Sequence, residues 1–296
     1  MPGRSRVTLR GPATVRGRGL FTGVSSELVI HPRESGGIVF WRSGLAPSEQ
    51  IPALAQHVGF DPRLPGRNTI LALDPSRPPA IDNPGAVTVE HVMSALAGLG
   101  VTDARIVLTG PEVPIGDGSA AFLAGAIASA GTRELGAAVE PIVVRERLVV
   151  KDPRGTGEIV AEPIDGDRLE LAYTLDYGAA GGLAPQTFSW TWDSRTYAHE
   201  VAPARTFCLR REAEAMRAAG LFSWVTTNEM LVLGDDGRPI DNEFRFPDEP
   251  ARHKLLDLLG DLYLAGAPII GRITAVRSGH ALNGIMARTL RAHAGL

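Results

Sequence analysis

The sequence passes twice through the same order of predicted elements: several short strands and then helices. Strands are expected in segments rich in Val, Ile, Leu or Thr and bounded by Gly or Pro. In the first half these are 4–10, 26–31, 37–41, 68–73 and 103–109, and in the second half 142–151, 158–161, 168–174 and 186–191. Helices are expected at 88–99, 119–130, 209–219, 249–265 and 281–293. This order predicts an α+β fold in both halves, although no convincing sequence repeat relates them.

The length of the chain favours two domains. Its 296 residues exceed what one hydrophobic core usually organises. A polar stretch at 132–140 lies between the two strand series, so we place the boundary there. We expect an N-terminal domain at 1–136 and a C-terminal domain at 137–296.

Charge and cysteine content exclude some classes of protein. The formal net charge is -3, which provides no cationic field for bulk nucleic-acid binding. Cys208 is the single cysteine, so no disulfide can form within the chain. We therefore expect a cytoplasmic protein that binds no nucleic acid. We also expect it to be a monomer.

No segment of the sequence has the character of a membrane span. The arginine-containing start is not followed by an apolar run, so we expect no secretory signal. The longest weakly polar stretch, 120–131, is much shorter than the roughly 20 residues that a spanning helix needs. It is typical of a buried helix, and any membrane association is expected to be peripheral.

Segment 248–266 predicts a helix, with Asp248 in position to cap it. His253, Asp257 and Asp261 follow one another at intervals of four residues, which places an imidazole and two carboxylates on one helix face. This is a spacing that metal ligands use. For this helix alone, a surface stripe in which His253 pairs with Asp257 remains the favoured alternative.

A second charged pair lies at the start of the predicted helix that begins with Thr88 as its cap. Here Glu90 stands beside His91, and the rest of the helix is apolar or small. A catalytic zinc takes three protein ligands, and an adjacent carboxylate can accept a proton from water. His91 would complete such a set with His253 and Asp257. Alternatively, Glu90 is a carboxylate favoured by the helix dipole and His91 a buried core histidine.

His280 follows a glycine at a predicted strand-to-helix junction. A side chain at such a junction can be both accessible and held in place, which suits a proton donor. A histidine that caps the helix is an equally good interpretation of this segment alone.

Six blocks taken together resemble one known family, the zinc-dependent UDP-3-O-acyl-N-acetylglucosamine deacetylases of lipid A biosynthesis. The resemblance runs nearly from end to end. The blocks are GRGLFTG (17–23), TVEHVMSALAGLG (88–100), GPEVPIGDGSAAFL (110–123), ARTFCLR (204–210), RHKLLDLLGDL (252–262) and IIGRITAVRSGHALN (269–283).

This resemblance implies two similar domains, each a β-sheet packed against α-helices, with the active site between them. It also implies that Zn²⁺ is held by His91, His253 and Asp257. The reaction implied is hydrolysis of the N-acetyl group of an acylated UDP-N-acetylglucosamine, which gives acetate and a free amine.

The resemblance further implies roles for the other candidate residues. Glu90 is expected to be the general base, and His280 the positively charged general acid oriented by Asp261. The hydroxyl of Thr206 is expected to stabilise the oxyanion.

Substrate contacts are also implied. Phe207 is expected to pack on the substrate, and Lys254 to contact the sugar or the diphosphate. An insert at about 207–232 is expected to form an apolar passage for the acyl chain.

The sequence departs from the family pattern at two places near the expected site. Phe21 stands where the family has a histidine, and segment 221–233, which includes Trp224, replaces a glycine-rich turn. Two alternatives therefore stay open. One is a non-catalytic relative that binds a nucleotide sugar, against which the presence of every expected catalytic side chain argues. The other is a zinc deacetylase for a different N-acyl sugar.

Overall fold

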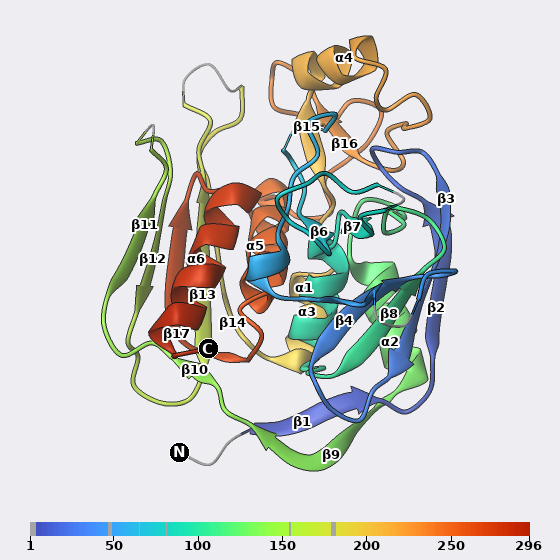
Figure 1. Ribbon diagram of the computed structural model, residues 1–296. Helices are drawn as coiled ribbons and strands as arrows, with labels where there is room; N and C mark the ends of the chain where they lie inside the picture. Colours follow the sequence, from blue (N-terminus) through green and yellow to red (C-terminus); the bar gives the residue numbers. More distant parts are fainter. Residues whose placement is uncertain (1–3, 47–48, 65, 81, 154, 179–181) are drawn as a thin grey trace.

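Two sheets, one from each half of the chain, lie on either side of a layer of helices (Figure 1). The computed structural model describes residues 4–46, 49–64, 66–80, 82–153, 155–178 and 182–296. The predicted α+β class, with sheets packed against helices, is confirmed.

The first sheet has the strand order β2-β3-β8-β4-β5, and its neighbours are antiparallel except for β4 and β8. Alternate side chains of β8 are buried, as expected for a sheet with one face on the core. Helix α2 (Ala121–Ala130) packs on this sheet at β2. The strands are β2 (Ala13–Arg18), β3 (Ser25–Pro32), β4 (Ile38–Arg42), β5 (Ile51–Pro52) and β8 (Ala104–Leu108).

The second sheet has the order β11-β12-β17-β13-β14, with β10 beside β17. Its burial also alternates, most regularly along β13. The strand expected at 142–151 is in fact two strands, because the chain leaves β17 after β10 and returns to pair with β12. The strands are β10 (Ile142–Val143), β11 (Leu148–Lys151), β12 (Glu158–Glu162), β13 (Leu169–Leu175), β14 (Gln186–Thr191) and β17 (Ile269–Val276).

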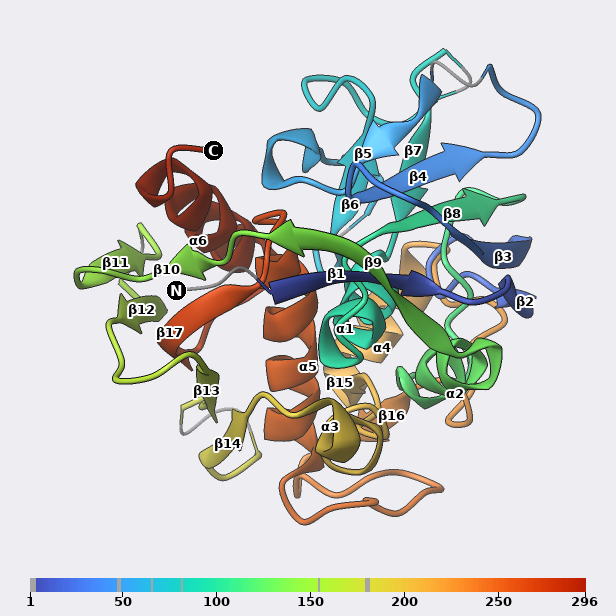
Figure 2. The same ribbon diagram turned by 90° about the horizontal axis from the view of Figure 1, so that it is seen from below.

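A two-stranded ribbon joins the halves at the end of the molecule shown in Figure 2. It consists of β1 (Arg4–Leu9) and β9 (Thr132–Val139), which are antiparallel. The polar stretch at 132–140 contains a strand that the sequence analysis did not predict, and this strand pairs with the start of the chain. The boundary near 136 stays a prediction.

The remaining elements surround the site or lie beside it. The segment expected as an insert contains a parallel pair of strands, β15 and β16, with helix α4 between them in the sequence. None of the described helices is both long and apolar enough to cross a membrane. These elements are η2 (Ala55–His57), β6 (Ile70–Ala72), β7 (Gly85–Val87), α3 (Ser194–Glu200), β15 (Phe207–Leu209), α4 (Arg210–Ala218) and β16 (Leu231–Leu233).

The two central helices, α1 (Glu90–Gly98) and α5 (Glu249–Tyr263), pack directly against each other. Every residue of α1 is buried. The contact is closest at Gly260, where a Cβ would lie 2.1 Å from the carbonyl oxygen of Glu90. A side chain at this position would therefore force the helices apart. Helix α6 (His280–His293) covers the outer side of α5 and the strands β11 and β12.

The side-chain caps predicted for α1 and α5 are wrong. Thr88 lies in the left-handed region at φ 59°, and its hydroxyl donates to the Glu112 carboxylate at 2.8 Å. Asp248 does precede α5, but its carboxylate accepts from Nε of Arg252 at 2.6 Å and caps no helix N–H group. In both cases another side chain binds the oxygen that would cap the helix. For Thr88 it is a carboxylate distant along the chain, and for Asp248 it is a guanidinium one helical turn ahead.

The close contact at Gly260 predicts that Gly260→Ala destabilises the fold. Adding a methyl group to a filled helix interface costs at least about 1 to 3 kcal/mol. Denaturant unfolding of the variant measures this loss. Gly125→Ala on α2 is the matched control, because a Cβ there meets nothing within 4 Å. It should raise stability by about 0.5 to 1 kcal/mol. Equal stability of the two variants would contradict the proposed role of the contact.

Candidate metal centre

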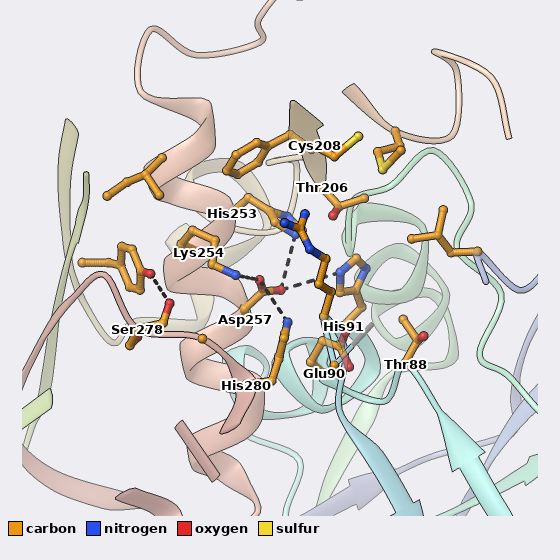
Figure 3. A pocket seen from close by; sticks show the side chains of 18 of the residues that line it. Thr88, Glu90, His91, Thr206, Cys208, His253, Lys254, Asp257, Ser278 and His280 are labelled. Carbon is orange, nitrogen blue, oxygen red and sulfur yellow. Dashed lines mark hydrogen bonds and ion pairs between the residues drawn. The ribbon is translucent and has the colours of Figure 1, made fainter. Parts of the chain in front are cut away.

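His91 on α1 and the pair His253 and Asp257 on α5 converge at the interface of the two helices (Figure 3). One ligand atom from each of these side chains lies within 4.8 Å of the others, and all three residues are buried. The spacing of four residues places His253 and Asp257 one helical turn apart. The third side chain comes from the other half of the chain.

Hydrogen bonding fixes the orientation of His253. Its Nδ1 donates to the carbonyl oxygen of Ala204 at 3.0 Å, so Nε2 carries the lone pair. This Nε2 lies 3.3 Å from Oδ1 of Asp257, and Nε2 of His91 lies 3.8 Å from the same oxygen. The three groups therefore direct their donor atoms toward one small region.

The chemistry of these groups fits a divalent metal ion. Oδ1 of Asp257, which faces both imidazoles, is buried and has no hydrogen-bond partner among the residues that the structure describes. Burial, reinforced by His253, lowers the pKa of His91 to about 3, and burial also lowers the pKa of His253. Both imidazoles are thus neutral near pH 7, which is the form that binds a metal.

Lys254 keeps Asp257 ionised. Burial alone would raise the pKa of Asp257, but the neighbouring His253 and Lys254 outweigh it and hold this pKa well below its usual range. Nζ of Lys254 donates to Oδ2 at 2.6 Å, so the other oxygen, Oδ1, faces the two imidazoles. The residue that we expected to contact the substrate therefore also orients a candidate ligand.

Glu90 lies beside this group at the first position of α1. Its carboxylate accepts from the backbone N–H of Thr69 at 2.9 Å. Burial raises the pKa of Glu90 to about 8, although the charge of His280 acts in the opposite direction. A carboxylate with such a raised pKa is a stronger base than an exposed one.

His280 begins α6 and faces the same pocket. Asp261 accepts from Nδ1 of His280 at 2.9 Å and from the side chain of Asn283 at 2.8 Å. Burial would lower the pKa of His280, but the charges of Asp261 and Glu90 raise it to about 9. His280 is therefore held as a cation, with Nε2 3.8 Å from Oδ2 of Asp257.

One pocket of about 460 Å³ brings the candidate residues together. Asp261 is not part of its lining and supports His280 instead. The pocket extends from the candidate ligands to an apolar end formed by side chains of both halves. The candidate residues that line it are Glu90, His91, Thr206, Phe207, His253, Lys254, Asp257 and His280.

Sequence reasoning missed a buried ion pair that supports the site. Arg205 donates to Glu249 through its backbone N–H and its guanidinium, at 2.8 to 3.1 Å. The pair holds the backbone at Arg205 in place. The residues on either side are Ala204, whose carbonyl accepts from His253, and Thr206. A buried charge needs such a partner. Arg205 lies in one of the six blocks, but its partner is 44 residues away, and no local pattern joins them.

Thr69 and Glu112 were also missed. Thr69 donates its hydroxyl to Asp261 and its N–H to Glu90, which joins the two carboxylates. Glu112 is fully buried and accepts from the hydroxyl of Thr88 and the backbone N–H groups of Phe21 and Thr22. The position of Glu112 within a block was a signal, but its partners lie in distant turns.

Comparison with known proteins identifies the family of this chain. The family model described as UDP-3-O-acyl N-acetylglycosamine deacetylase matches residues 6–292. Three similar proteins are each named UDP-3-O-acyl-N-acetylglucosamine deacetylase. That of Myxococcus xanthus (strain DK1622) is 38% identical over 283 residues, which cover 93% of this chain and 83% of the relative. That of Anaeromyxobacter sp. (strain Fw109-5) is 37% identical, with coverage of 94% and 86%. That of Geobacter sp. (strain M21) is 37% identical, with coverage of 93% and 85%. The chain therefore belongs to the UDP-3-O-acyl N-acetylglycosamine deacetylase family.

Proposed function

We propose that this protein is a zinc-dependent hydrolase that removes the N-acetyl group from UDP-3-O-acyl-N-acetylglucosamine in lipid A synthesis. The observation that carries the proposal is the convergence of His91, His253 and Asp257 beside Glu90 and His280 in one pocket. Membership of the family supplies the substrate class.

Zinc is the metal that suits two neutral imidazoles and one carboxylate in a hydrolase. Three protein ligands leave one coordination position open. When bound, the ion supplies Lewis acidity, which polarises the acetamide carbonyl and makes water more acidic.

Glu90 acts as the general base in this proposal. Its carboxylate takes a proton from the water that attacks the carbonyl carbon of the acetamide. The backbone N–H of Thr69 holds one carboxylate oxygen in place, and the charge of His280 favours the ionised form of Glu90 that a general base needs.

Thr206 and His280 act on the charge that develops after attack. The hydroxyl of Thr206 lines the pocket and stabilises the oxyanion by donating a hydrogen bond. His280 then gives its proton to the nitrogen as the C–N bond breaks, so that a neutral amine leaves with acetate as the other product. Asp261 fixes the ring of His280 throughout.

Lys254 and Phe207 are proposed to contact the substrate, since both line the pocket beside the reacting centre. Lys254 suits an oxygen of the sugar or the diphosphate, and Phe207 suits an apolar part of the substrate. The cytoplasmic location and the monomeric state expected from the sequence stay predictions.

The proposed ligands predict about one zinc ion per chain and its loss in His253→Ala. Removal of one of three ligands should lower the zinc content severalfold or more after dialysis against a weak chelator. Metal analysis of the purified proteins measures this. His199→Ala is the control, since His199 is exposed on α3. A zinc content of His253→Ala equal to that of the control would reject this ligand set.

The role of Glu90 predicts that Glu90→Gln keeps its zinc and loses turnover. Loss of a general base should lower kcat by about 10² to 10⁴-fold, with little change in metal content. Acetate release measured beside zinc content separates the two effects. Glu140→Gln is the control, since Glu140 is exposed. Turnover of Glu90→Gln near that of the control would remove Glu90 from this role.

The proposed substrate predicts that acetate release depends on the acyl chain. Burial of that chain in the apolar end of the pocket should raise kcat/KM for UDP-3-O-acyl-N-acetylglucosamine well above that for UDP-N-acetylglucosamine. Coupled acetate detection with both compounds measures the ratio. Equal values, or a preference for an N-acyl sugar without the nucleotide, would favour a deacetylase of another substrate class.

A further inference from the structure

The apolar end of the pocket is built from side chains of both halves. Its lining includes Phe21 from the loop after β2 and Phe222 from the insert. Both belong to a second hydrophobic cluster, separate from the main core. The other buried members of this cluster are Leu20, Ile115, Cys208, Ala213, Val225, Met230 and Val232. The ring centroid of Phe207, the residue before Cys208, lies 6.4 Å from that of His253, so this apolar end adjoins the candidate metal ligands in the pocket of Figure 3.

Phe222 has a strained backbone. Its φ is 56°, in the left-handed region that a bulky residue rarely adopts. Yet its side chain is only 5% exposed, and its ring centroid lies 5.5 Å from that of Phe21. A strained residue persists where the surrounding structure holds it, and such residues concentrate at functional sites. Here the strain directs the ring of Phe222 into the pocket lining, against Phe21.

Trp224, two residues after Phe222, holds this segment of the insert against the other half of the chain. Its Nε1 donates to the carbonyl oxygen of Gly19 at 3.1 Å, and the guanidinium of Arg18 lies over its ring. At Gly23 a Cβ would lie 2.8 Å from the Trp224 ring. The indole thus fits closely against the loop that carries Phe21. The segment that carries Phe222 is therefore held against the loop that carries Phe21.

We infer that Phe222 and Phe21 form the end wall of the acyl site and limit the length of the 3-O-acyl chain that this enzyme accepts. The inference rests on the proposed function. An acyl chain gains from each methylene that it buries, but only until its end meets the two rings. Longer chains must then bend back or leave methylenes in water. Position 21 and segment 221–233 are also the places at which the resemblance leads us to expect this chain to differ from other members of the family.

The experiment measures kcat/KM for UDP-3-O-acyl-N-acetylglucosamines that differ stepwise in acyl length. For wild type, kcat/KM should rise by up to about fourfold for each added methylene that is buried, and then stop rising or fall. In Phe222→Gly the rise should continue to longer chains, because the ring is gone. Glycine also adopts the left-handed backbone without strain, so this variant should remain folded.

Phe21→Ala provides a second and independent opening of the wall, and it should shift the preferred length in the same direction. Phe60→Gly is the matched control, since Phe60 is exposed and does not line the pocket. Its length profile should equal that of wild type.

The outcomes separate a failure of the wall inference from a failure of the proposed function. If wild type releases acetate but Phe222→Gly and Phe21→Ala keep its preferred length, the wall inference is wrong and the proposed function stands. If wild type releases no acetate from any acyl length, the proposed function itself fails. A shift to longer chains in either variant, and not in Phe60→Gly, supports the wall.

Discussion

The close packing of helices α1 and α5 is the contact on which the rest of the site depends. The two helices come from different halves, and each carries part of the candidate ligand set. Gly260 lets the α5 backbone approach the start of α1, where Glu90 and His91 lie. A metal site tolerates displacements of only about 0.5 Å. Mounting the donors on two buried helices provides that precision, whereas two mobile loops would not.

The same contact concentrates charge where water is excluded. Glu90, Asp257 and Asp261 are all buried, and three carboxylates so close together would repel one another strongly. Two cations offset this charge through hydrogen bonds: Lys254 binds Asp257, and His280 binds Asp261. Because Lys254 binds Oδ2 of Asp257, Oδ1 of the same carboxylate has no hydrogen-bond partner within the described part of the chain. Buried charge arranged in this way is typical of a functional site and adds little to stability.

The sequence predicted most reliably what depends on local spacing. His253 and Asp257 share a helix face because of the 3.6-residue period, and the stops at Gly131 and Gly266 follow from their left-handed backbone, with φ of 70° and 89°. The joining of His91 to that pair is a long-range contact, which the need of a zinc ion for three ligands suggested and the resemblance made specific. The strand at 132–139 was missed for the same reason, since its pairing partner lies at the start of the chain. The Thr88 cap failed because a distant carboxylate binds the same hydroxyl.

The loop that carries Phe21 is held through its backbone, so the side chain at position 21 can differ without disturbing the candidate catalytic residues. Glu112 binds the loop after β2 through backbone N–H groups, including that of Phe21. The position of this loop therefore does not depend on which side chain residue 21 carries. Glu112 also accepts from Thr88, two residues before Glu90, so the same carboxylate holds the turn that leads into the catalytic helix. A change of the side chain at position 21 can thus reshape the proposed acyl site while the backbone around Glu90 and His91 stays in place.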